Sequence, residues 1–348
     1  MTAATASAAV PRAAARESLV LAALCLLLGG AILLALTAGR FPVAPQRALT
    51  ILLSAPFAED VATIEERVVL LVRLPRVLLA AIAGAGLAVS GAALQGVFRN
   101  PLVAPQILGI SPGAAFGGAL AILLGFSGAA MVGMSFAMGL AALVVVGLVA
   151  RVGGRTEILT VILAGLVVGA LFGALVSLLQ FVADPNGSLP AIVYWLMGSF
   201  ATATWERLFL ALPGLLLGIA LLLLLRFRLN LLSLDEAEAR SLGVRPEQER
   251  WLVFGLVALV VGSQVAVSGI VGWIGLVIPH AARFLVGHDH RALLPASALL
   301  GAAFLVVVDT LARTLTAAEI PLGVLTALIG APVFALLLRR HYRGRLGT

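Results

Sequence analysis

The sequence predicts an all-α integral membrane protein with about ten transmembrane helices, folded as a single domain over residues 1–348. Hydrophobic residues make up 61% of the chain and charged residues only 11%, whereas a soluble domain carries about a quarter charged residues. A helical crossing takes about 20 apolar residues, and the apolar runs leave room for about ten crossings. The polar stretches between these runs are too short to fold as separate domains.

Hydropathy, together with breaks at Gly, Pro and charged residues, locates the individual spans. They are expected near residues 18–38, 76–97, 105–124, 129–150, 157–182, 207–226, 250–268, 273–286, 293–315 and 322–339. The span at 273–286 is short for a crossing. We therefore expect irregular backbone beside it, which a membrane tolerates where the backbone is buried in protein.

The N-terminal apolar run is expected to remain as the first span. Arg12 and Arg16 precede a run at 19–36 that is longer than the core of a secretory signal and lacks a convincing cleavage site. Residues 1–17 would then form a cytoplasmic tail.

The distribution of arginine predicts the orientation. All 23 basic residues are arginine; with the N-terminus in the cytoplasm, 16 of the 23 fall on the inside, and the remaining seven fall outside. The positive-inside rule favours this arrangement, with both termini cytoplasmic. Residues 40–75, with a surface helix near 60–72, and residues 183–206, with a short apolar segment around 194–200, would then be external.

Composition also limits the chemistry. The single cysteine, Cys25, lies in the first apolar run, so one chain can form neither a disulfide framework nor a thiolate metal site. The arginines lie at the ends of apolar runs rather than on one solvated face, which indicates topology rather than nucleic-acid binding. Small residues four apart, Gly113 with Gly117 and Gly165 with Gly169 and Gly173, indicate close helix packing.

An internal repeat is suggested at an offset of 178 residues. AVSG at 88–91 recurs at 266–269, and the same offset pairs Gly84 with Gly262, Pro101 with Pro279 and Gly109 with Gly287. Five helices separate the two copies, so the second would enter the membrane from the opposite side. Such inverted repeats are typical of transporters.

Ordered motifs along the chain resemble the FecCD-type permease family of binding-protein-dependent ABC importers, which import ferric siderophores, haem and cobalamin. The motifs are RLPR at 73–76, SG at 90–91, QG at 95–96, NPL at 100–102, LGISPGA at 108–114, WLMGS at 195–199, GLVIPH at 275–280, GHDHR at 287–291, PLG at 321–323 and GAP at 330–332. Each motif alone is weak, but their order over most of the chain is specific.

The resemblance implies a permease that moves a ferric-siderophore-type ligand from the periplasm to the cytoplasm across the bacterial inner membrane. It implies a homodimer with the translocation path at the interface, two ATP-binding cassette subunits on the cytoplasmic side and a periplasmic or lipid-anchored binding protein. The chain has no lysine, and therefore no Walker-type phosphate loop. We expect it not to be an enzyme and to hold no cofactor, with ATP and Mg²⁺ on the partner subunit.

A cytoplasmic coupling segment is expected at 232–246. Ser233 and Glu236 have the spacing of a capping box, Asp235 suits a helix N-terminus, and Gly243 can end the helix in a left-handed conformation. In similar permeases this loop fits a groove on the ATPase. The resemblance therefore implies that the following residues couple: Leu234, Glu236, Ala239, Arg240, Leu242 and Gly243.

Three outer arginines, Arg73, Arg76 and Arg313, are the expected docking residues for the binding protein. Arginine pairs well with carboxylates, and in similar permeases arginines at these positions meet glutamates of the binding protein. Interfacial anchoring is the alternative, and for Arg313 a local pair with Asp309, one helical turn earlier, is the favoured role.

The resemblance also implies a translocation path and inner gate, to which these residues are assigned: Gln95, Asn100, Pro101, Ser111, Gly113, Pro279 and His280. No metal site is expected, because His288, Asp289 and His290 are adjacent and arginine-flanked, which indicates a polar turn between helices.

Two other functions compete. A proton-coupled secondary transporter would use an intramembrane carboxylate, and Asp309 is the one well inside a predicted span. An intramembrane enzyme is the weaker alternative, since the spans carry no recognisable catalytic pair and the chain has no Gly-x-Ser-x-Gly. Siderophore, haem, cobalamin and oxyanion all remain open as the ligand.

Overall fold

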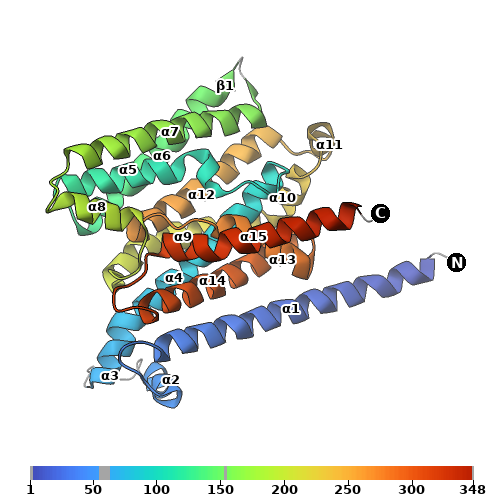
Figure 1. Ribbon diagram of the computed structural model, residues 1–348. Coiled ribbons are helices and arrows are strands. Elements are labelled where there is room, and N and C mark those ends of the chain that lie inside the picture. The colour runs from blue at the N-terminus through green and yellow to red at the C-terminus, as the bar shows by residue number, and fades with distance from the viewer. Residues whose placement is uncertain (1–2, 55–62, 153–154, 347–348) are drawn as a thin grey trace.

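The computed structural model describes residues 3–54, 63–152 and 155–346 and shows a helical bundle (Figure 1). Its elements are α1 (Ala3–Thr37), α2 (Pro45–Ser54), α3 (Ile64–Arg67), the π-helical η2 (Val68–Arg73), α4 (Leu74–Val97), the 3-10 helix η3 (Pro105–Leu108), α5 (Ile110–Leu123), α6 (Gly128–Ala150), β1 (Arg151–Val152), β2 (Arg155–Thr156), α7 (Ile158–Val182), α8 (Ser188–Leu196), α9 (Trp205–Leu224), α10 (Arg226–Leu232), α11 (Glu236–Ser241), α12 (Pro246–Ser268), α13 (Ile274–Val286), α14 (His290–Thr314) and α15 (Leu322–Leu346).

The described apolar helices match in number the ten spans that hydropathy predicts. Seven are long and apolar enough to span a membrane, and three shorter apolar helices, Ile110–Leu123, Ile274–Val286 and Leu322–Leu336, bring the number to ten (7 + 3). The all-α prediction is confirmed. The antiparallel pair β1–β2 contributes only two residues per strand.

The bundle has two distinct ends (Figure 1). One end, called here the terminal end, carries both chain termini, α10, α11 and β1–β2. The other, called here the opposite end, carries α2, α3 and α8. Helix α4 starts at the opposite end and α12 at the terminal end, which is the relation that an inverted arrangement requires.

Helices α4 and α12 form the centre of the bundle. In the most apolar stretch of each helix, 83% of the residues are buried in the span that contains α4 and 78% in α12. The corresponding values are 22% for α1 and 28% for α7. Glycines allow the central helices to touch: a Cβ added at Gly84 of α4 would collide with the carbonyl of Gly301 on α14, and one at Gly91 would collide with the carbonyl of Gly275 on α13. This close backbone contact is how helices pack in lipid.

Two helices begin earlier in the chain than the predicted spans. Helix α1 begins at Ala3, so the described part of the expected tail at 1–17 is helical. The surface helix near 60–72 is instead an extension of the second span, since α3, η2 and α4 form one unbroken helix from residue 64 to 97; residues 60–62 lie outside the described residues.

The third predicted span is also interrupted, and several short helices lie outside the predicted spans. Gly109 has φ 70° and separates η3 from α5, because this left-handed backbone cannot continue a right-handed helix. Helix α2 has no counterpart among the predictions, and α8 begins six residues before the apolar segment at 194–200. The short eighth span is confirmed as α13, with 13 residues.

The 178-residue offset aligns these elements only in part. It pairs Gly84 and residues 88–90 of α4 with Gly262 and residues 266–268 of α12, but it pairs Gly109 at the start of α5 with Gly287 just after α13. Beyond the α4–α12 pair, the matching residues do not occupy equivalent helices. The inverted repeat itself stays a prediction.

Candidate functional site

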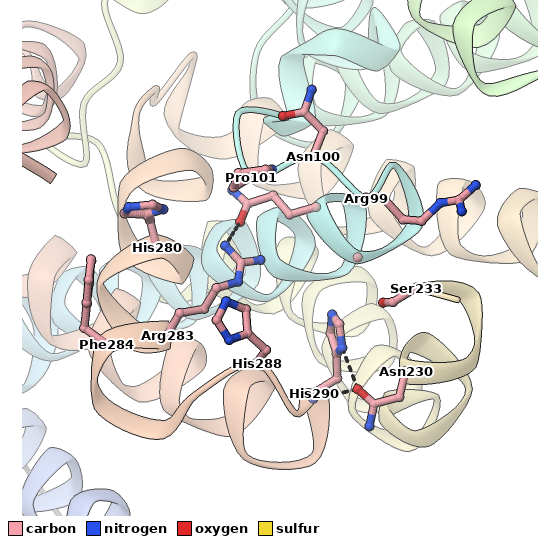
Figure 2. Close-up of a pocket in the computed structure, with 12 residues that line it drawn as sticks. Arg99, Asn100, Pro101, Asn230, Ser233, His280, Arg283, Phe284, His288 and His290 are labelled. Atoms are coloured by element: carbon pink, nitrogen blue, oxygen red, sulfur yellow. Dashed lines mark hydrogen bonds between the residues drawn. The ribbon is translucent and has the colours of Figure 1, made fainter. Parts of the chain in front are cut away.

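A cavity of about 360 Å³ opens among α4, α10, α13 and the start of α14. Twelve residues line it: Gln95, Gly96, Arg99, Asn100, Pro101, Asn230, Ser233, His280, Arg283, Phe284, His288 and His290 (Figure 2). Four of the predicted path and gate residues, Gln95, Asn100, Pro101 and His280, are therefore brought together.

The other three predicted gate residues do not line this cavity. Ser111 is buried near the start of α5, and Gly113 packs against Met138 and Ala142 of α6. Pro279 is buried inside α13, beside His280. Gly113 is therefore a helix-packing residue in this structure, because an added Cβ would meet the α6 backbone.

Gln95 links α4 to α13 at the deep end of the cavity. Its Nε2 donates to the carbonyls of Val103, Gly275 and Leu276 at 3.2, 3.3 and 3.4 Å. Its Oε1 accepts a hydrogen bond of 2.6 Å from Nη1 of Arg283. The carbonyl contacts fix the amide orientation, so the amide oxygen faces the guanidinium.

Asn230 of α10 orients the start of α14. Its Nδ2 donates to Oδ1 of Asp289 at 2.7 Å, and its Oδ1 accepts from the backbone N–H of His290 at 2.9 Å and lies 2.7 Å from Nδ1 of that ring. Asp289 also accepts from Arg291, and these hydrogen bonds lower the pKa of its carboxyl to about 2. The sequence 288–290 forms the predicted polar turn, in which Asp289 caps α14.

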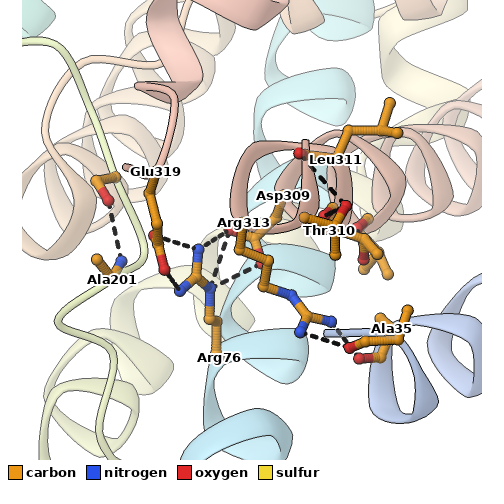
Figure 3. A network of polar contacts seen from close by, with 12 residues as sticks. Ala35, Arg76, Ala201, Asp309, Thr310, Leu311, Arg313 and Glu319 are labelled. Atoms are coloured by element: carbon orange, nitrogen blue, oxygen red, sulfur yellow. Dashed lines mark hydrogen bonds and ion pairs between the residues drawn. The ribbon is translucent and has the colours of Figure 1, made fainter. Parts of the chain in front are cut away.

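The three predicted docking arginines make contacts inside the bundle: Figure 3 shows those of Arg76 and Arg313, and Arg73 donates to the carbonyl of Leu36. Arg76 of α4 forms ion pairs with Asp309 of α14 at 2.8 Å and with Glu319 at 2.9 Å. The predicted local pair between Asp309 and Arg313 is wrong, because helix packing brings Arg76 to the carboxylate instead. Sequence reasoning missed Glu319, which lies in the loop before α15.

Arg73 and Arg313 bind the C-terminal end of α1 and the loop that follows it. Arg73 donates to the carbonyls of Leu36, Thr37 and Phe41, and Arg313 donates to those of Ala35 and Ala38. The last carbonyls of a helix lack intrahelical donors and carry partial negative charge, so cations suit them. In this structure the predicted docking arginines are thus internal contacts rather than a displayed surface.

The expected coupling segment forms the short helix α11 between α10 and α12 at the terminal end. The predicted capping box is wrong: Ser233 ends α10, and its hydroxyl donates to the carbonyl of Leu229, while Asp235 occupies the N-cap position of α11. Gly243 has φ 81°, as predicted for a left-handed helix end.

Charged contacts and one buried alanine hold α11 against the bundle. Asp235 pairs with Arg99 at 2.5 Å, and Glu236 lies 4.0 Å from Arg250 of α12, whereas the 2.8 Å hydrogen bond from Arg240 to Glu236 lies within α11 itself. Ala239 is 1% exposed, whereas Leu242 is 56% exposed at the end of the helix. Leu234 is half-buried. The segment is therefore a short helix that contacts the bundle through Asp235 and Ala239 and exposes the apolar side chain of Leu242 at its C-terminal end, called here the tip of α11.

The comparisons with known proteins agree with this architecture. Residues 25–340 match the model of the FecCD transport family. The chain is 46% identical over 325 residues to the molybdate import system permease protein MolB of Haemophilus influenzae, covering 92% of this chain and 96% of that protein. It is 44% identical over 284 residues to the hemin transport system permease protein HmuU of Yersinia pestis, covering 79% and 84%.

A solved structure described as the inward-facing conformation of a metal-chelate type ABC transporter superposes with a TM-score of 0.84. It shares 46% sequence identity and covers 92% of this chain and 98% of its own. This chain therefore belongs to the FecCD transport family.

Proposed function

We propose that this chain is the permease subunit of an ABC importer in the bacterial inner membrane, working as a homodimer with two ATPase subunits and a substrate-binding protein. The observation that carries this proposal is α11, a braced helix with the exposed Leu242 at its tip, in a chain of the FecCD transport family. ATP hydrolysis takes place on the partner subunits.

The coupling residues would work by transmitting movement of the ATPase into the bundle. Helix α11 is tied to the loop after α4 through Asp235 and Arg99, and Glu236 lies 4.0 Å from Arg250 of α12. A displacement of α11 would therefore act on both central helices. This supports Leu234, Glu236, Ala239, Arg240, Leu242 and Gly243 as the coupling segment.

Two classes of cargo compete. A ferric-siderophore-type ligand is the first candidate, with haem or cobalamin as variants, and the Yersinia pestis relative is described as a hemin permease. A small oxyanion is the second candidate, because the Haemophilus influenzae relative, which matches 92% of this chain, is described as a molybdate permease.

Docking of a binding protein through Arg73, Arg76 and Arg313 remains part of the proposal. It requires that a carboxylate of the partner replace an internal acceptor, above all Glu319 at Arg76. Glu319 is the more accessible of the two carboxylates, with 27% of its side chain exposed against 2% for Asp309.

The proposal is tested in proteoliposomes that contain this chain with an ATPase subunit and a substrate-binding protein from the same organism. ATP-dependent uptake is measured in parallel for a ferric siderophore, hemin, cobalamin and molybdate, and the chain alone serves as the control. Uptake should require ATP and all components. Proton-driven uptake by the chain alone, without ATP, would instead identify a secondary transporter.

A further inference from the structure

The cavity at the terminal end has positive charge that the surrounding chain does not neutralise. Two arginines and three histidines face it, and no aspartate or glutamate is among the described residues that line it. Arg99 is paired with Asp235 at the rim. Among the described residues, no carboxylate forms an ion pair with Arg283.

Arg283 is held by a neutral partner. The guanidinium is half-buried, and its hydrogen bond to Gln95 is made by Nη1 alone. An amide oxygen satisfies one donor but supplies no opposite charge, and a cation removed from water is costly without a counter-charge. An anion in the cavity would provide it.

The form of the cavity fits a small anion. Its volume of about 360 Å³ is near the lower end of the range for ligand sites, roughly 300–1,000 Å³. The planar guanidinium can present two parallel N–H groups to an oxyanion. His288 is exposed on the turn after α13, and Figure 2 shows its ring beside the Arg283 side chain.

We propose that this cavity binds a small tetrahedral oxyanion of the molybdate, sulfate or phosphate class, with Arg283 as its charged ligand and His288 at its mouth. The inference rests on the proposed function and deepens it, because it assigns a cargo class to the terminal end of the permease.

Binding is measured on the full chain in nanodiscs of zwitterionic lipid, by equilibrium dialysis with radiolabelled molybdate and competition with sulfate and phosphate. Arg283→Gln should weaken molybdate binding at least about tenfold, because a charge-assisted bidentate contact is lost. Arg228→Gln is the matched control, since Arg228 lies outside the cavity and pairs with Glu249. Equal binding by Arg283→Gln and the wild type would overturn the proposal.

A second pair of variants covers the case in which Arg283→Gln fails to fold. His288→Glu places a carboxylate near Arg283 from an exposed turn, whereas His288→Gln adds a neutral side chain of the same length. Molybdate binding should fall at least about tenfold in His288→Glu and stay within about threefold of wild type in His288→Gln. Equal affinities in the two variants would refute the site.

Two further experiments distinguish a free oxyanion from a lipid headgroup as the ligand, and the oxyanion site from the proposed function. Nanodiscs with anionic lipid should leave the affinity unchanged if free oxyanion is the ligand, and a loss of binding there would assign the cavity to lipid headgroups. The complete complex is assayed separately. ATP-driven uptake of a chelate without any oxyanion binding would refute this inference and leave the proposed function standing. Oxyanion binding without ATP-driven transport would refute the proposed function and leave the oxyanion site standing.

Discussion

Arg76 on α4 and Asp309 on α14 form a buried ion pair across the two helices, with Nη2 and Oδ1 2.8 Å apart. Only 10% and 2% of their side chains are exposed. Because the two residues are separated by 233 positions, the pair fixes the lateral packing of α4 on α14 at the opposite end. Glu319 adds a second carboxylate to the same guanidinium.

Asp309→Asn should destabilise the protein by about 3 kcal/mol, since removing one partner of a buried pair leaves an incompletely compensated charge. The remaining contact with Glu319 keeps the cost at the lower end of that range. Thermal unfolding in detergent measures it, and Asp184→Asn, at an exposed loop position of the opposite end, is the control. ATP-driven uptake should persist in the folded fraction. A variant with unchanged melting temperature and no uptake would favour a proton-coupled mechanism instead.

Glu319→Gln should cost only about 1 kcal/mol, because this carboxylate is partly solvated and its pairing is screened. If Arg76 docks a carboxylate of the binding protein, loss of the internal competitor should tighten the complex several-fold. Surface plasmon resonance with the permease in nanodiscs measures the affinity, with Glu206→Gln, an exposed glutamate at the same end, as the control. An unchanged affinity would argue against docking at Arg76.

The number of spans could be predicted from the sequence because the cost of exposing polar backbone to lipid imposes long apolar helices. Interruptions and boundaries of individual helices were harder to predict. Gly109 sits in an apolar run that hydropathy alone reads as continuous, and only its positive φ shows the interruption. Residue 64 starts a helix that crosses the predicted membrane boundary, because the extension packs against α2 rather than lying on the surface.

The residues of the candidate site were predictable only in part. Motif resemblance selected Gln95, Asn100, Pro101 and His280, which do line one cavity. In the sequence Arg283 is only one of the 16 arginines counted on the inside, because its separation from carboxylates depends on how α13 packs on α4. The spacing of Ser233 and Glu236 predicted a capping box that does not form, because the Ser233 hydroxyl donates to the carbonyl of Leu229 in the preceding helix α10.

Gly84→Ala and Gly301→Ala should each destabilise the bundle by about 1–3 kcal/mol, as overpacking does in a tight interior. At both positions an added Cβ would strike the backbone of the other helix, so α4 and α14 would have to separate. Gly30→Ala is the control, because nothing lies within 4 Å of the added Cβ there. Equal melting temperatures for all three variants would show that the two helices are not in close contact.

Leu242→Ala and Gly243→Ala should reduce ATP-driven uptake by different routes. Leu242→Ala removes the exposed apolar tip of α11 and should weaken association with the ATPase, measured by co-purification, without changing the melting temperature.

Gly243→Ala meets no steric obstacle but forces a side chain into the left-handed region, at a cost of about 1 kcal/mol. It should therefore loosen the turn and lower uptake per ATP hydrolysed more than it lowers association. Leu53→Ala is the control, since Leu53 is 74% exposed on α2 at the opposite end. If all three variants retain wild-type uptake and association, α11 is not the coupling helix.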